Sequence, residues 1–164
     1  MINGRHLGMT DTGGSLFIVG IGNTLRSDDG IGDFICRELS CLPLKNTEIS
    51  FALQLNTEWL EIFLAYDTVI MVDARADGDQ QVRFEPVQPD QYLSSRTSHY
   101  LDASTLSALI TGLLGSKPSL LVCSVRGYDF SIGEGLSPRG MTTALEALRV
   151  LRRWLTENGY LAPD

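Results

Sequence analysis

A few side chains that could bind a metal ion or activate water stand where strands are expected to end or helices to begin. Asp28 and Asp29 follow a short apolar run and a glycine-rich turn. Asp73 ends a second apolar run, and His99 stands where a polar segment gives way to a helical pattern. Two carboxylates and one imidazole form an O,O,N metal site when a fold brings them together. We therefore predict that Asp29, Asp73 and His99 bind a metal ion.

Each of these residues also has a structural interpretation. An aspartate in front of a helix can cap it and favours its positive end, and we expect this of Asp28, which leaves Asp29 free to point into a crevice. An aspartate at the end of a strand is common as a turn former. A lone histidine such as His99 is more often a surface or core residue than a ligand. Because these residues share a position at the carboxyl ends of strands, we favour metal binding over these structural roles.

Nucleophilic catalysis by serine or cysteine has little support in the sequence. Cys36 and Cys41 fall in an expected helix and Cys123 in an expected strand, so we interpret all three as core thiols in a reducing compartment. Ser124 and Ser137 lack both a GxSxG context and a second histidine to activate them.

The elements that must position these residues alternate between strand and helix. Apolar runs and helical spacing predict strands at 16–20, 48–55, 68–73, 81–86 and 119–125, and helices at 30–42, 57–65, 98–114 and 138–158. This order predicts one α/β domain over residues 16–160, a three-layer sandwich with a twisted, mainly parallel sheet of about five strands and helices on both faces. The polar strand bounded by proline is expected at an antiparallel edge. In such sheets, ligands bind beyond the carboxyl ends of the strands.

Composition argues against several classes of function. The 164 residues carry a formal net charge of −7, whereas a nucleic-acid partner requires a basic surface. No apolar run is long enough to span a membrane, and residues 1–15 lack the apolar centre of a signal peptide. We therefore expect residues 1–15 to be a flexible tail, and the protein to be cytoplasmic with no nucleic-acid or membrane partner.

The glycine-rich segment also suggests an alternative, a noncatalytic α/β module that binds a cofactor or small anion. Gly20 and Gly22 match the start of a dinucleotide-binding motif, but Leu25 stands where its third glycine belongs. The Asp28–Asp29 pair would also repel a pyrophosphate at the helix N-terminus. A cofactor role is therefore the weaker interpretation of this segment.

Four segments, in order along the chain, resemble motifs of the nickel-iron hydrogenase maturation proteases: residues 19–32, 67–74, 97–99 and 130–138. The resemblance implies an endopeptidase that removes the C-terminal extension of a hydrogenase large-subunit precursor after nickel insertion. It places Asp29, Asp73 and His99 at the three positions that contact nickel. The precursor supplies that nickel, and other divalent ions such as zinc or cadmium could occupy the site.

The resemblance also frames the mechanism and the partner. Nickel is expected to act as a recognition element, and Asp29 or Asp73 could activate the attacking water as a general base. The expected partner is the precursor, and the protein is expected to be a monomer. Residues 54–60 lack the glycine-threonine turn that family members often carry. A self-sufficient metallohydrolase of small substrates is a third possibility, which would retain a tightly bound metal after purification.

Overall fold

A five-stranded sheet forms the centre of the molecule in the computed structural model, which describes residues 14–87, 108, 112 and 118–163. The sheet order is β2-β1-β3-β5-β4, with parallel pairing throughout except for β4, which runs antiparallel to β5 at one edge. The predicted α/β class and the antiparallel edge strand are confirmed. The strands are β1 (Leu16–Ile21), β2 (Thr47–Ala52), β3 (Thr68–Arg75), β4 (Val82–Pro86) and β5 (Ser119–Arg126).

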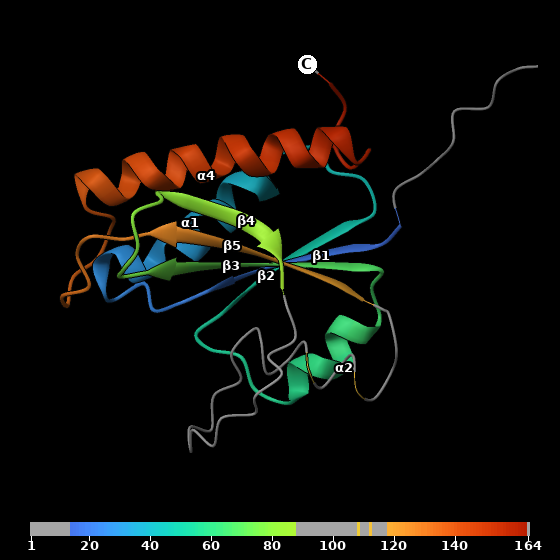
Figure 1. The fold of residues 1–164 in the computed structure, drawn as a ribbon, viewed down its shortest axis with the longest axis horizontal. Helices are drawn as coiled ribbons and strands as arrows, with labels where there is room; N and C mark the ends of the chain where they lie inside the picture. The colour runs from blue at the N-terminus through green and yellow to red at the C-terminus, as the bar shows by residue number, and fades with distance from the viewer. Residues whose placement is uncertain (1–13, 88–107, 109–111, 113–117, 164) are drawn as a thin grey trace, which may run out of the picture.

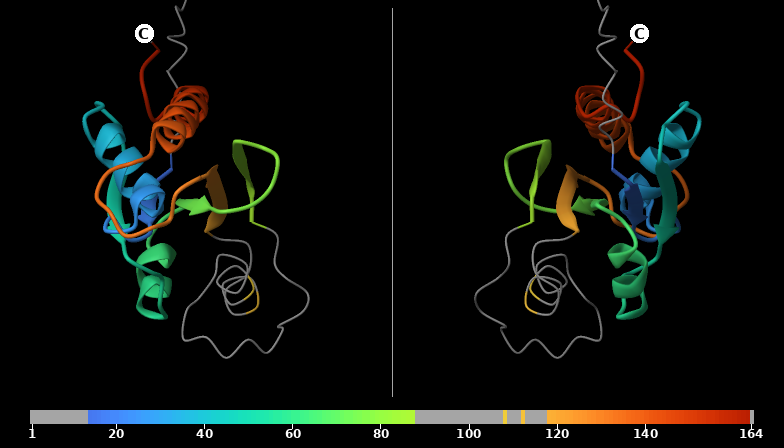
Figure 2. Two further views of the ribbon diagram at one scale, coloured as in Figure 1. Left: turned by 90° about the vertical axis from the view of Figure 1, so that its left-hand side faces the viewer. Right: turned by 90° about the vertical axis from the view of Figure 1, so that its right-hand side faces the viewer.

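Helices cover both faces of this sheet. Helices α1 and α4 lie on one face and α2 on the other (Figure 1), and the two side views show the same layers (Figure 2). The helices are the 3-10 turn η1 (Ser27–Gly30), α1 (Ile31–Ser40), α2 (Glu58–Leu64) and α4 (Pro138–Glu157). The helix predicted over residues 98–114 lies outside the described residues. Within them, no helix has the length and apolar character needed to cross a bilayer.

Two apolar clusters fix the sheet between its helices. Leu16 and Ile18 of β1 pack in the cluster beneath α1 and α4, whereas Phe17 and Val19 pack in the cluster on the α2 face. All four side chains are buried, as expected for a central strand of a parallel sheet that is covered on both faces.

Several local expectations need correction. Asp73 lies within β3, which continues to Arg75, because β5 pairs with β3 through that residue. The helix predicted over residues 57–65 is slightly shorter, since α2 runs from Glu58 to Leu64, and the side chain of Asn56 accepts a hydrogen bond from the backbone N–H of Glu58 at its start, at 3.1 Å. Cys41 is exposed after the end of α1 and is not a core thiol.

The C-terminal helix was predicted well. Ser137 caps α4 by accepting a hydrogen bond from the Gly140 N–H at 2.9 Å, and Pro138 occupies the first turn. Gly159 follows the helix with a φ of +81°, a conformation that favours glycine at a helix end.

Candidate metal and catalytic site

The order of the strands reverses between β1 and β3. Strand β2 pairs with one side of β1, and β3 pairs with the other. In open parallel sheets, ligand sites lie beyond the carboxyl ends of the strands at such a reversal. Ile21, the last residue of β1, is in register with Asp73 of β3. Asp73 therefore lies at the position where this topology places a ligand.

Glycines allow η1 and α1 to pack closely against these strand ends. A Cβ atom on Gly22, whose φ is +142°, would lie 2.0 Å from the carbonyl oxygen of Asp29. A Cβ atom on Gly32 would lie 2.7 Å from the backbone nitrogen of Ile21 and 2.8 Å from the carbonyl oxygen of Val72. The glycines are thus required by contacts between backbones, and this packing brings Asp29 toward Asp73.

The two aspartates interact through their charges. One carboxylate oxygen of Asp29, Oδ2, accepts a hydrogen bond from the backbone N–H of Asn23 at 2.8 Å, which orients the group. Burial and the charge of Asp29 raise the pKa of Asp73 from 3.8 to about 6, against the effect of a hydrogen bond from the backbone of Ala74. Two adjacent carboxylates in a partly buried position suit either a shared proton or a divalent cation.

The third predicted ligand, His99, lies outside the described residues, so its place relative to the two aspartates stays a prediction. Within the described part of the chain, no group of three or more histidine, cysteine, aspartate or glutamate side chains could hold a metal ion. Asp29 and Asp73 therefore supply two oxygen donors, and a complete O,O,N site needs a further donor such as His99.

Asp28 has a structural role, but the prediction that it caps the following helix is wrong. It does not cap α1, whose first residue receives no side-chain cap. Its fully buried carboxylate accepts hydrogen bonds from the backbone N–H groups of Tyr128, Asp129 and Ser137 at 2.8, 3.0 and 2.7 Å, and from the Ser137 hydroxyl at 2.8 Å. Burial acts to raise the pKa of Asp28, but these hydrogen bonds outweigh it and hold the pKa below 3.8.

Backbone hydrogen bonds reinforce this contact between η1 and the loop that precedes α4. The N–H of Ser27 donates to the carbonyl of Gly133 at 2.8 Å, and the N–H of Gly133 donates to the carbonyl of Leu25 at 2.9 Å. The first and last of the four motif segments are therefore bound to each other. The joint presence of both motifs was the only sequence signal for this contact.

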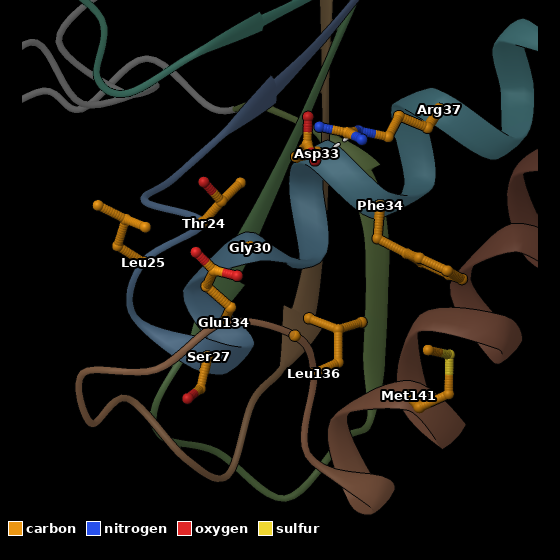
Figure 3. A pocket seen from close by; sticks show the side chains of 11 residues that line it. Thr24, Leu25, Ser27, Gly30, Asp33, Phe34, Arg37, Glu134, Leu136 and Met141 are labelled. Atoms are coloured by element: carbon orange, nitrogen blue, oxygen red, sulfur yellow. Dashed lines mark ion pairs between the residues drawn. The ribbon is translucent and has the colours of Figure 1, made fainter.

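A pocket of about 400 Å³ lies beside this contact, between α1, α4 and their preceding loops (Figure 3). Asp33 and Arg37, which form an ion pair at 2.7 Å, contribute its polar lining. Neither Asp29 nor Asp73 lines the pocket, so it is separate from the carboxylate pair. Its apolar lining comes from Leu25, Phe34, Leu136 and Met141.

Comparisons with known proteins agree with the fold. No protein-family model and no curated protein matches the chain. The hydrogenase maturating endopeptidase HybD from E. coli matches with a TM-score of 0.74 and 20% identity, over 88% of this chain and 94% of its own. An endopeptidase from Escherichia coli matches with a TM-score of 0.73 and 21% identity, over 90% and 95% of the two chains. The NiFe hydrogenase maturation protease HycI from Thermococcus kodakarensis KOD1 matches with a TM-score of 0.68 and 21% identity, over 88% and 95%. The chain therefore has the fold of the hydrogenase maturation proteases.

Proposed function

We propose that this protein is an endopeptidase that removes the C-terminal extension from the large-subunit precursor of a nickel-iron hydrogenase. The observation that carries the proposal is the pairing of Asp29 with Asp73 where the strand order reverses. The fold shared with maturation proteases and the order of the four motif segments support the same conclusion. The proposed partner is the precursor, and the monomeric state and cytoplasmic location stay predictions.

Nickel held by the precursor is the proposed recognition element. Asp29 and Asp73 would supply oxygen donors, and a divalent cation would relieve the repulsion that now raises the pKa of Asp73. His99 is the proposed nitrogen donor. When bound, the ion would polarise the carbonyl of the bond to be cleaved. A precursor without nickel would lack this contact and bind more weakly.

Asp73 is the proposed general base in this reaction. A bound divalent cation would keep it in the ionised form that accepts a proton. It would accept a proton from the water that attacks the scissile carbonyl carbon and return that proton to the leaving amine. The hydrogen bond from Asn23 holds Asp29 in place beside it.

The cofactor-binding alternative is disfavoured by how the glycine-rich segment packs. The space a Cβ would need at Gly22 or Gly32 is filled by backbone atoms of the same domain, so these glycines leave no cradle for a phosphate group. The alternative of a metallohydrolase for small substrates predicts a metal ion that stays bound through purification. The proposed protease retains little or none.

The decisive experiment mixes the protein with nickel-loaded and with nickel-free precursor and follows loss of the extension by mass spectrometry. We expect cleavage of the nickel-loaded precursor only, and loss of cleavage in Asp29→Asn, Asp73→Asn and His99→Ala. Asp33→Asn is the matched control, because it removes a nearby carboxylate outside the pair. Retained cleavage in all three site variants would refute the assignment of the site.

A further inference from the structure

Four arginines lie near the carboxyl edge of the sheet, two of them against the ring of Tyr128. Arg75 ends β3 and is in register with Arg126, which ends β5. The guanidinium carbon of Arg139 lies 3.8 Å from the centre of the Tyr128 ring, and that of Arg126 lies 5.5 Å from it. With Arg83 of β4, these residues form what we term the arginine cluster.

Arg83 joins the cluster through the turn that links β3 to β4. A Cβ atom on Gly78 would lie 2.7 Å from Nη1 of Arg75 and 3.3 Å from Nη2 of Arg83, so both guanidinium groups reach the same point. Arg75 donates hydrogen bonds to the carbonyl oxygens of Asp77 and Gln80, which fixes its side chain on this turn. Its Nε atom is buried and has no hydrogen-bond partner among the residues that the structure describes.

The described residues offset the positive charge of this cluster only in part. None of their carboxylates lies within ion-pair distance of the four guanidinium groups. Burial and the charges of Arg83 and Arg126 lower the pKa of Arg75, while the charge of Asp77 acts in the opposite direction. Such a concentration of like charge, in a chain whose net charge is −7, attracts an anion.

Three members of the cluster, Arg75, Arg83 and Arg126, share a sheet face with Asp73, whereas Arg139 reaches Tyr128 from the first turn of α4, which covers the opposite face. Side chains alternate along a strand, so Asp73 and Arg75 point to the same face as Val69 and Met71, which pack on the α2 side. Arg83 lies on that face too, because its neighbours along β4 pack in the opposite cluster. Two residues along a strand span roughly 7 Å, a distance that a short extended peptide also covers.

We propose that the arginine cluster binds a carboxylate group of the protein substrate, within a few residues of the bond that is cleaved. The identity of that substrate rests on the proposed function, whereas carboxylate binding itself does not. Guanidinium groups match a carboxylate with two parallel hydrogen bonds. Arg83 and Arg139 are exposed and Arg126 is partly exposed, so they are able to reach a ligand, while Arg75 holds the turn. The acidity of the whole chain disfavours a long polyanion such as a nucleic acid.

Fluorescence anisotropy with three labelled six-residue peptides tests this proposal. The first has two central glutamates and an amidated end, the second has glutamines in their place, and the third has glutamines with a free carboxyl end. We expect the first or the third peptide to bind at least about tenfold more tightly than the second. Tighter binding of the first shows that the cluster prefers a side-chain carboxylate, and tighter binding of the third shows that it prefers the carboxyl end of a chain. Arg83→Gln and Arg126→Gln should each weaken that binding by roughly tenfold.

Arg153→Gln is the control for net charge, because Arg153 is exposed on α4 and lies outside the cluster. Arg83→Lys, which keeps the charge but loses the paired geometry, should show an intermediate loss. Equal binding of all three peptides, or an equal loss in Arg153→Gln, would overturn the proposal. So would tighter binding of an oligothymidylate than of any peptide.

Cleavage assays with the precursor distinguish failure of this proposal from failure of the proposed protease function. If the wild-type protein leaves the nickel-loaded precursor intact, the proposed protease function fails, and the peptide measurements still decide whether the cluster binds carboxylates. If cleavage occurs but Arg83→Gln and Arg126→Gln leave the KM for the precursor unchanged, the cluster does not bind the substrate, and the proposal fails while the protease function stands.

Discussion

Replacement of Asp73 by asparagine should make the folded protein more stable while it removes activity. The pKa of Asp73 is about 6 in the folded protein against an ordinary value of 3.8. Each pH unit of this difference is worth about 1.4 kcal/mol, so the ionised carboxylate costs the folded state about 3 kcal/mol. Asparagine keeps the shape of the side chain without the charge and avoids that cost.

The stabilisation has a definite dependence on pH. Folding raises the pKa of Asp73, so the contribution of this residue to the stability of the wild-type protein is fully present below pH 3.8. That contribution is lost as the pH rises through about 6, because the carboxylate then ionises in the folded protein. The variant should therefore exceed wild type by under about 1 kcal/mol at pH 4 and by about 3 kcal/mol at pH 8. For a chain of this length, the larger value corresponds to a rise in Tm of roughly 6–12 °C.

Urea unfolding at both pH values, with a chelator present to remove divalent ions, measures this difference. Asp33→Asn is the control, because its ion pair with the exposed Arg37 is worth at most about 1 kcal/mol. Two results would refute the reasoning: an Asp73→Asn protein no more stable than wild type at pH 8, or a gain as large at pH 4 as at pH 8.

Three other changes probe the same region. Asp28→Asn should destabilise the protein by about 3 kcal/mol at pH 7, because a buried acceptor of four hydrogen bonds is replaced. The low pKa of Asp28 means that this loss should shrink as the pH falls below 3.8, which urea unfolding at pH 3 and pH 7 measures. Gly22→Ala should lower the free energy of unfolding by more than about 1 kcal/mol and slow precursor cleavage, because its Cβ would collide with the Asp29 carbonyl oxygen. Thermal unfolding measures the first effect and mass spectrometry the second. Added nickel should raise the Tm of wild type but not of Asp29→Asn, and an equal rise in both would place the ion elsewhere.

The fold was predictable because its strands are buried in a regular way. Apolar runs identified the central strands, and the polar, proline-bounded segment ending at Pro86 identified the antiparallel edge. Strand and helix ends were predicted less well. Asp73 looked like a terminus because its polarity interrupts an apolar run, but pairing with β5 carries the strand on to Arg75.

Only the proximity of Asp29 and Asp73 could be tested against the structure. It was predictable because both residues follow buried runs whose carboxyl ends meet at one edge of the sheet, and their role in binding a metal ion stays a prediction. The true role of Asp28 was hidden, because its partners Tyr128 and Ser137 lie about a hundred positions further along the chain, as the separations of 100 and 109 residues show. The arginine cluster was missed for the same reason, since three separate strands and a helix contribute to it.

The hydrogen bonds of Asp28 also bear on how the protein matures during synthesis. The loop that receives η1 follows the last strand, and Ser137 immediately precedes the last helix. A nascent chain that ends before Tyr128 has all five strands but lacks every later group that binds Ser27 and Asp28 of η1. The segment η1 can therefore dock only after most of the domain, through at least residue 128, has been synthesised.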